Sequence, residues 1–384
     1  RTALKLHDIG LELVRNADGD IGFRVYVGGG MGRTPMIAPV IREFLPWRLV
    51  LTYIEAILRV YNRYGRRDNV WKARIKILVK SLGAEEFARQ VDAEWAAIKD
   101  SPSIVTDEEL ARVAAHFAPP RYDVGDTVQT PLTDSLPASS ADGRAFARWV
   151  ERNVHPHRQP GYAAVTLSLK KTGAAPGDVT SGQMEFIADL ADRYSFGELR
   201  VSHEQNLVLA DVRKDDLFAL WREAKSGGLA TPNIGLLTNI VSCPGGDFCS
   251  LANAKSIPVA QAIQERFEDL DYLHDIGELD LNISGCMNSC GHHHIGHIGI
   301  LGVDKNGAEW YQVSIGGAQG NDTHLGQVIG PSFAAHEMPD VVERLIETYL
   351  QLRHDDERFV DTVHRVGIAP FKERVYATEV ARAA

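Results

Sequence analysis

The stretch that decides the fold runs from residue 243 to residue 291. It opens with Cys243-Pro-Gly-Gly-Asp-Phe-Cys249 and closes with Ser284-Gly-Cys286-Met-Asn-Ser-Cys290-Gly291. These are all the cysteines of the chain, and they form two close pairs that lie far apart in the sequence. Four paired thiols in a long acidic chain indicate a metal and a reducing compartment rather than the disulfide framework of a small secreted protein.

Three interpretations of the cysteine pairs follow from the residues alone. A structural zinc site usually has about two to four residues inside each pair, whereas the first pair here encloses five. Buried free thiols would not be expected in pairs with glycines around them. An iron–sulfur cluster fits best, because it needs four thiolates and backbone N–H donors from close turns. The spacing does not identify the type of cluster.

The size and charge of the chain exclude several classes of protein. It has 384 residues, 44% of them hydrophobic, and a formal net charge of −10, which argues against nucleic acid and an anionic membrane surface as partners. No stretch reaches the roughly 18 uninterrupted apolar residues of a membrane helix. The nearest, residues 45–61, is broken by charges and predicts an amphipathic helix. We therefore expect a cytoplasmic protein with no membrane or nucleic-acid partner.

The two ends of the chain share a repeated pattern. Its landmarks are Asp8-Ile9-Gly10-Leu11 with His297-Ile298-Gly299-Ile300, Gly28-Gly29-Gly30-Met31-Gly32 with Gly316-Gly317-Ala318-Gln319-Gly320, and Gly83 before Phe87 with Gly367 before Phe371. They occur in the same order, the first two at nearly equal spacing, which favours homologous halves over chance. In the second copy a long segment with all four cysteines precedes the first landmark. The first copy begins at residue 8, so we expect it to be cut short.

The segment between the repeats predicts a separate small module. Residues 119–142 are rich in Pro, Ser, Asp and Thr and predict a linker. Beyond the linker we expect a strand over 162–169, a helix over 180–194, two strands within 199–212 and a helix over 217–224. This β-α-β-β-α order suits a small α+β sandwich. A further domain begins near Leu236 and ends with a long helix over 339–353.

The cysteine signature resembles that of the sirohaem-dependent sulfite and nitrite reductases. Three further segments are similar to that family: Leu199-Arg-Val-Ser-His-Glu-Gln-Asn206, His157-Arg-Gln-Pro-Gly-Tyr162 and Val27-Gly-Gly-Gly-Met-Gly-Arg33. The resemblance covers essentially the whole chain. It implies an α+β fold in which paired ferredoxin-like modules and paired mixed α/β reductase modules form a pseudo-twofold repeat around one sirohaem.

The same resemblance implies the domain boundaries. We expect the C-terminal part of a first reductase half over 1–118, the linker over 119–142, a second ferredoxin-like module over 143–232, and a second reductase half with the cysteines over 233–384. The first ferredoxin-like module and the start of the first reductase half would be missing.

The resemblance also implies two cofactors and their ligands. A [4Fe–4S] cluster would be bound by Cys243, Cys249, Cys286 and Cys290, and Cys290 would also be the axial ligand of the sirohaem iron. Asn288 would hydrogen-bond near the cluster. Arg200, Gln205 and Asn206 would line the sirohaem, whose many carboxylates require cationic and amide donors. From the residues alone, Arg200 also reads as a surface arginine, and Gln205 with Asn206 as a turn with local hydrogen bonds.

The implied activity is the six-electron reduction of sulfite to sulfide, with electrons from ferredoxin or a flavoprotein reductase. Nitrite reduction to ammonia with the same cofactors is the nearest alternative. A non-catalytic iron–sulfur electron carrier and a zinc-stabilised binding module also remain open. The family's active-site lysines and most of its catalytic arginines are expected ahead of residue 1, so no catalytic residue is assigned.

Two groups of side chains receive weaker interpretations. Lys72, Arg74 and Lys76 alternate along an expected helix and are predicted to solvate its surface. His293 and His297 have the i,i+4 spacing of a zinc pair on a helix. The glycines and isoleucines around them predict a strand and a turn instead.

Overall fold

The computed structural model describes residues 3–122 and 140–377. The chain divides into two compact units, one of Arg1–Pro119 with Gln319–Leu325 and one of Pro120–Ala318 with Gly326–Ala384. The boundaries between the four predicted segments stay a prediction, and most of the expected linker, residues 123–139, lies outside the described residues. No helix in the described ranges is long and apolar enough to cross a membrane.

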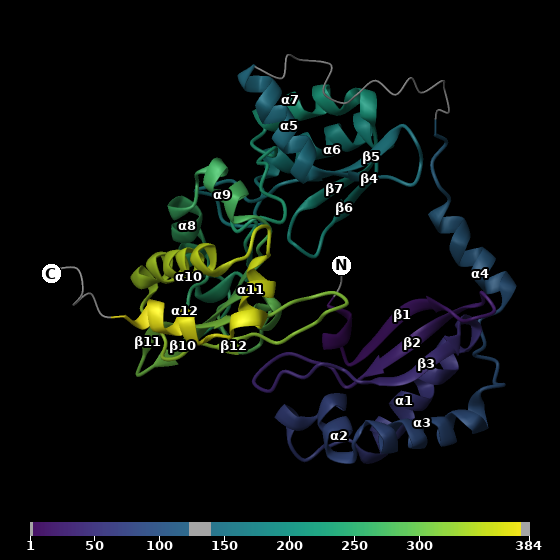
Figure 1. Ribbon diagram of the computed structural model, residues 1–384. Coiled ribbons are helices and arrows are strands. Elements are labelled where there is room, and N and C mark those ends of the chain that lie inside the picture. Colours follow the sequence, from purple (N-terminus) through teal and green to yellow (C-terminus); the bar gives the residue numbers. More distant parts are fainter. Residues whose placement is uncertain (1–2, 123–139, 378–384) are drawn as a thin grey trace. The chain divides into compact units, whose positions relative to one another are not determined.

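Unit 1 is an antiparallel sheet with helices packed on one face (Figure 1). The sheet has the order β1 (Ile9–Arg15), β2 (Ile21–Val27), β3 (Val40–Pro46). The helices are α1 (Val50–Tyr64), α2 (Ile75–Leu82), α3 (Ala84–Ile98) and α4 (Asp107–Ala114). Buried Tyr53, Ile57 and Val60 of α1 recur at helical spacing and pack with Val25 and Leu45 of the sheet.

The start of α1 corrects the predicted amphipathic helix over 45–61. Residues 40–46 instead form β3, in which Leu45 pairs with Phe23 and Val40 with Tyr26 of β2. The helix begins only at Val50. Strand pairing with a distant segment overrode the local helical pattern here, because it buries Leu45 in the core.

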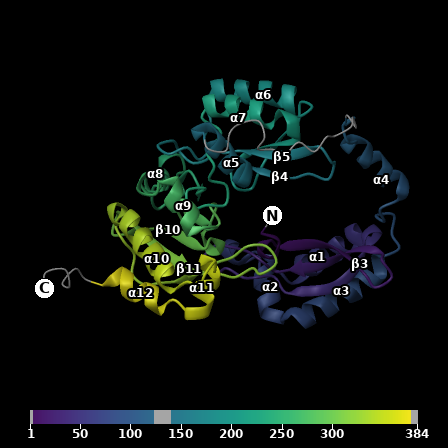
Figure 2. The same ribbon diagram turned by 45° about the horizontal axis from the view of Figure 1, so that its top comes forward.

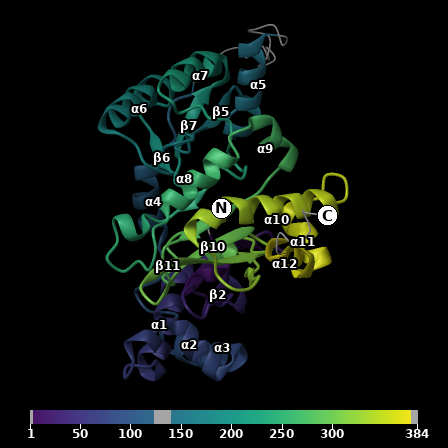
Figure 3. The same cartoon turned by 90° about the vertical axis from the view of Figure 1, so that its left-hand side faces the viewer.

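The module after the linker contains the expected β-α-β-β-α run over 162–226, and an unpredicted helix and short strand over 141–156 precede it (Figure 3). Its antiparallel sheet has the order β4 (Val154–Pro156), β5 (Tyr162–Leu167), β7 (Leu207–Arg213), β6 (Leu199–Val201). Its helices are α5 (Ala141–Asn153), α6 (Ser181–Tyr194) and α7 (Leu217–Ser226). A capping box between Thr180 and Gln183 fixes the start of α6. The helix buries Ile187 and Leu190 in the module's core.

The last part of unit 2 is a mixed five-stranded sheet flanked by helices (Figure 2). The strands run in the order β12 (Gln327–Val328), β11 (Ala308–Ile315), β10 (Ile298–Lys305), β9 (Leu281–Ser284), β8 (Val241–Ser242). Strands β8, β9 and β10 are parallel to one another, and the other pairs are antiparallel. The helices are α8 (Ile257–Arg266), α9 (Leu270–Ile276), α10 (Met338–Leu352), α11 (Phe359–Val366) and α12 (Ala369–Tyr376). The long helix expected over 339–353 is confirmed as α10.

The predicted repeat is present in the backbone. Ile9 of β1 pairs with Val27 of β2, and Ile298 of β10 pairs with Ile315 of β11 in the same antiparallel arrangement. The residue after each second strand is a glycine with positive φ. The N–H of Gly28 donates to Asp8 O (2.9 Å), and that of Gly316 donates to His297 O (3.0 Å).

The helices that follow repeat the same contacts. A Cβ at Gly28 would lie 2.8 Å from Val79 of α2, and one at Gly316 would lie 3.0 Å from Val363 of α11. The two glycines are therefore required by close approach as well as by their positive φ. Both helices also end at a glycine, Gly83 and Gly367.

Candidate cofactor site

Two parallel strands bring the cysteine pairs together. Strands β8 and β9 are neighbours, with Val241 opposite Asn282 and Ser242 opposite Ile283. Each strand runs directly into a cysteine loop, β8 into Cys243 and β9 into Gly285 and Cys286. Because the carboxyl ends of parallel strands meet at one edge of a sheet, the two loops lie side by side. The N–H of Cys243 continues the pairing by donating to Ile283 O (3.1 Å).

The loops contact each other through backbone at a glycine. The carbonyl of Gly285 accepts from the N–H groups of Asn253 (2.9 Å) and Ala254 (3.1 Å). A Cβ at Gly285 would lie 2.6 Å from Ala254 O and 2.9 Å from Gly245 Cα. A side chain at this position would therefore force the two cysteine loops apart.

Two buried polar residues of β9 hold the end of the second loop. Asn282 Nδ2 donates to Gly291 O (2.9 Å), and the N–H of Gly291 donates to Ser284 Oγ (3.1 Å). Sequence reasoning missed both residues. The available signal was a pair of polar residues inside an otherwise apolar, fully buried strand, since a buried polar group needs a hydrogen-bond partner.

The thiols have the surroundings that cluster ligands need. The N–H of Gly285 donates to Cys243 Sγ (3.0 Å), and Ser256 Oγ lies 3.4 Å from the same sulfur. Partial burial of the sulfur raises the pKa of the Cys290 thiol, and the thiols of Cys243, Cys286 and Cys249 raise it further by repulsion. As thiolates the sulfurs would repel one another, and bound iron would relieve that repulsion. These residues fit a [4Fe–4S] cluster.

The four cysteines differ in exposure. Cys286 is buried, Cys243 and Cys249 are half-buried, and Cys290 is exposed. The interpretation as buried free thiols is therefore wrong for Cys290. Within 3–122 and 140–377, no three His, Cys, Asp or Glu side chains gather as the ligands of a single metal ion.

Of the residues implied to surround the sirohaem, only Gln205 contacts the cysteine region. Its Nε2 donates to Ser242 O (2.7 Å), and its Oε1 accepts from the N–H of Ser242 (3.0 Å), so the amide clamps the residue before Cys243. Asn288 is exposed between the second pair of cysteines. Arg200 is exposed on β6 and pairs with Glu198 (2.5 Å).

Asn206 is fully buried in unit 2, where it forms part of the wall of an apolar cavity. Its Oδ1 accepts from the N–H of Leu169 (3.0 Å), and its Nδ2 donates to Asn239 Oδ1 (2.9 Å). These bonds tie the β6–β7 turn to β5 and to the segment before β8. The hydrogen bonds of Asn206 therefore fix the backbone next to Gln205.

An apolar cavity of about 790 Å³ opens beside Cys243 within unit 2. Its lining includes Gln205, Cys243, Met184, Val201 and Phe248. Phe248 is 78% exposed, although it lies between two predicted cluster ligands. Met184 of α6 is also exposed and lines this cavity.

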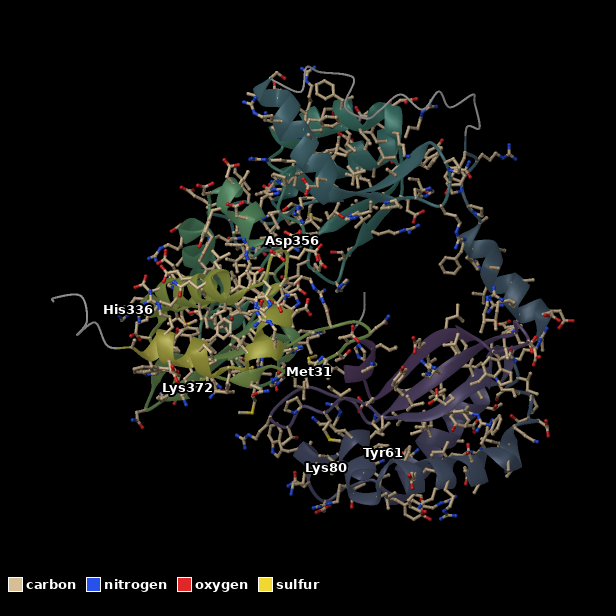
Figure 4. The ribbon with its side chains drawn as sticks, in the orientation of Figure 1. Met31, Tyr61, Lys80, His336, Asp356 and Lys372 are labelled. Atoms are coloured by element: carbon tan, nitrogen blue, oxygen red, sulfur yellow. The ribbon has the colours of Figure 1, made fainter. Side chains whose placement is uncertain are left out.

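The basic residues of unit 1 are not all on a helix surface. Lys76 is buried, and its Nζ donates to the carbonyls of Met31 (2.7 Å) and Thr34 (2.8 Å). Figure 4 labels Met31 on this loop. Burial lowers the pKa of Lys76. The prediction that this lysine solvates the helix is therefore wrong, whereas Lys72 is exposed as predicted. Arg74 forms a two-bond ion pair with Asp8 (3.1 and 2.8 Å).

The histidine run adopts the predicted turn and strand. Residues His293–Ile295 form a single 3₁₀ turn, and β10 begins at Ile298, so the helix needed for a zinc pair is absent from this segment. His293 is buried with no hydrogen-bond partner on either ring nitrogen, and burial lowers its pKa to about 3. His297 Nδ1 accepts from the N–H of Asp280 (3.1 Å).

Comparison with known proteins gives relatives of two named activities. The chain is 26% identical to sulfite reductase (ferredoxin) 2 of Mycolicibacterium paratuberculosis, covering 94% of this chain and 60% of that protein. It is 30% identical to the chloroplastic ferredoxin–nitrite reductase of Zea mays, covering 86% and 53%. The structure of the Mycobacterium tuberculosis NirA protein matches with a TM-score of 0.71 at 25% identity, covering 97% and 61%. The chain thus spans a little over half the length of these relatives.

Two family models match the chain. Residues 1–99 and 235–382 match the nitrite and sulphite reductase 4Fe-4S domain, and residues 155–227 match the nitrite/sulfite reductase ferredoxin-like half domain. The first match falls on both copies of the repeat and on all four cysteines, and the second falls on the β-α-β-β-α module. The chain belongs to the sirohaem- and [4Fe–4S]-dependent nitrite and sulphite reductase family.

Proposed function

We propose that the chain carries the redox centre of a sulfite reductase, which reduces sulfite to sulfide in a six-electron reaction. The observation that carries the proposal is the meeting of two cysteine loops at the ends of β8 and β9. In this proposal Cys243, Cys249, Cys286 and Cys290 bind the [4Fe–4S] cluster. Backbone N–H donation to Cys243 and the glycine contact between the loops support it.

The difference in exposure among the cysteines supports a second role for Cys290. A thiolate shared between the cluster and the sirohaem iron must present one side outward, and Cys290 is the exposed member of the set. When bound, the cluster and the sirohaem would supply one-electron transfer. The protein holds the sulfur in place through Gly291, which is tied to Asn282 and Ser284.

The electron donor and the substrate are proposed from the relatives' names. Both relatives named above depend on ferredoxin, and we propose ferredoxin as the donor, with a flavoprotein reductase as the alternative. Sulfite is our first choice of substrate. Nitrite is the second candidate, favoured by the 30% identity to the maize nitrite reductase. A cytoplasmic location is part of the same proposal.

Spectroscopy and turnover test the main proposal. The chain produced with sirohaem and iron should show the Soret and long-wavelength bands of sirohaem and the EPR signal of a reduced [4Fe–4S] cluster. A cluster signal without sirohaem bands would favour the electron carrier, and a colourless protein with one zinc would favour the binding module. If the loaded protein turns over nitrite much faster than sulfite with reduced ferredoxin, our choice of substrate is wrong.

A further inference from the structure

Lys170 is a fully buried lysine that no part of the proposed reaction uses. It follows β5, and its side chain is 0% exposed, among the largest fully buried side chains of the described residues. Its N–H donates to Ser168 Oγ (3.3 Å), and its carbonyl accepts from Asn233 Nδ2 (3.2 Å). The backbone is therefore fixed on both sides of the lysine. A buried ammonium is costly, so its position calls for a physical reason.

The ammonium leads to the first cysteine in three steps. Lys170 Nζ donates to Gln205 Oε1 (3.1 Å). The same amide makes both hydrogen bonds to the backbone of Ser242, and Ser242 directly precedes Cys243. A cationic donor fixes which end of the amide is the oxygen, and so fixes the direction of both bonds to Ser242. The backbone of Gln205 is in the left-handed region, with φ 58°. This conformation is uncommon for a residue other than glycine.

The charges around Lys170 come from two other segments. The carboxylate of Glu204 in the β6–β7 turn and that of Asp178 before α6 both favour its charged form. Burial outweighs them and lowers the pKa of Lys170 to about 7. At pH 6 the side chain of Lys170 is therefore positively charged inside the protein. The side-chain amide of Gln205 connects this charge to Ser242, the residue before Cys243.

We propose that Lys170 is a positioning residue of the iron–sulfur cluster, which orients Gln205 to hold the Cys243 loop and whose charge favours the reduced cluster. The inference rests on the proposed assignment of the four cysteines. Reduction adds one electron to the cluster, and a nearby buried cation stabilises the more negative state. In the experiment below, dithionite supplies that electron.

Lys170→Met tests the charge while keeping much of the side-chain volume. The 384-residue chain with its cluster is titrated with dithionite at pH 6, and the reduced cluster is followed by EPR. We expect the equilibrium constant for one-electron reduction to fall about tenfold, a shift of about 59 mV for one electron. Lys171→Met is the matched control, because it removes the same charge from an exposed neighbour; its constant should change less than about twofold.

Gln205→Ala tests the clamp without removing the lysine. This variant should release iron to a chelator several times faster than the native chain, because the backbone before Cys243 loses both hydrogen bonds. A native reduction constant in Lys170→Met, or an equal shift in Lys171→Met, would overturn the inference while leaving the cysteine assignment intact. Absence of a [4Fe–4S] signal from the native chain would overturn the assignment itself, and the role of Lys170 with it.

Discussion

The two copies of the reductase repeat keep one backbone and carry different chemistry. Arg74 precedes α2 and Arg358 precedes α11, at the same distance before Gly83 and Gly367. In the first copy Arg74 pairs with Asp8. In the second copy His297 stands where the first has Asp8, and Arg358 pairs with Asp361 instead (2.7 Å).

The buried position two residues further on shows the same divergence. Lys76 holds the carbonyls of Met31 and Thr34 in the first copy, whereas Val360 occupies the equivalent place in the second and is buried. The second copy instead carries the thiols, in the loops that follow strands β8 and β9. The close contacts of Gly28 and Gly316 maintain the same fold in both copies. The side chains at the turns differ: the first copy carries the buried lysine and the Asp8–Arg74 pair, and the second carries the cysteines.

The substitution that should distinguish the two copies most strongly is Gly291→Ala, which should remove the cluster from the second copy only. A Cβ at this position would lie 1.9 Å from Ile283 O, so the Cys290 end of the second loop must leave β9. We expect loss of the cluster's visible absorbance and EPR signal, with unit 1 unchanged. Gly182→Ala is the control, because Gly182 is in unit 2, its φ is not positive and a Cβ there meets nothing within 4 Å. A cluster retained in Gly291→Ala would show that the loop needs no contact with β9.

The cysteine pairs and the repeat could be predicted because each is a local pattern of rare residues. What the sequence concealed are contacts between distant segments. The predicted start of the helix at residue 45 was wrong because β3 pairs with β2. The predicted exposure of Lys76 was wrong because its ammonium donates to backbone carbonyls far back in the chain, such as that of Thr34, 42 residues earlier. Lys170 was missed for the same reason, because its partner Gln205 lies 35 residues further along the chain.

The second largest effect is on stability and comes from Lys170, the buried lysine of unit 2 that lies outside the repeat. The folded pKa of Lys170 is about 7, below the ordinary lysine value of about 10.4. Between these values the unfolded chain binds more protons, so the free energy of unfolding should rise with pH, by at most about 5 kcal/mol. Below pH 7 both states are protonated, and the cost of the buried charge is fully present.

Lys170→Met should remove this rise and be the more stable protein at pH 6. Equilibrium urea unfolding of both proteins at pH 6 and pH 9 measures the difference, and Lys171→Met supplies the control for an exposed lysine. A parallel pH dependence in Lys170→Met would mean that another group causes the rise. Greater stability combined with weaker reduction of the cluster would separate the positioning role from a structural one.

A smaller effect is expected from Lys76→Met, which gives the first copy an apolar side chain where the second has Val360. The carbonyls of Met31 and Thr34 then lose a charged donor, at a cost of about 1–3 kcal/mol. Hydrogen exchange should show the loss locally, as faster exchange in residues 28–36. Lys80→Met, an exposed lysine of the same helix, should leave those amides as they are. Equal exchange in both variants would mean that the loop is held by its own backbone bonds, such as those between Gly30 and Met36.

The smallest effect on stability should come from Asp8→Asn, at the position that separates the two copies in sequence. The Asp8 and Arg74 side chains are 41% and 44% exposed, and ion pairs so open to water contribute at most about 1 kcal/mol. The N–H of Gly28 bonds the backbone carbonyl of residue 8, not its side chain, so the turn should survive. Stability close to native would show that the fold of this turn does not depend on the ion pair. A large loss of stability would instead show that the Asp8–Arg74 pair supports the fold of the first copy. A different interaction would then have to replace it in the second copy, where His297 occupies the position of Asp8.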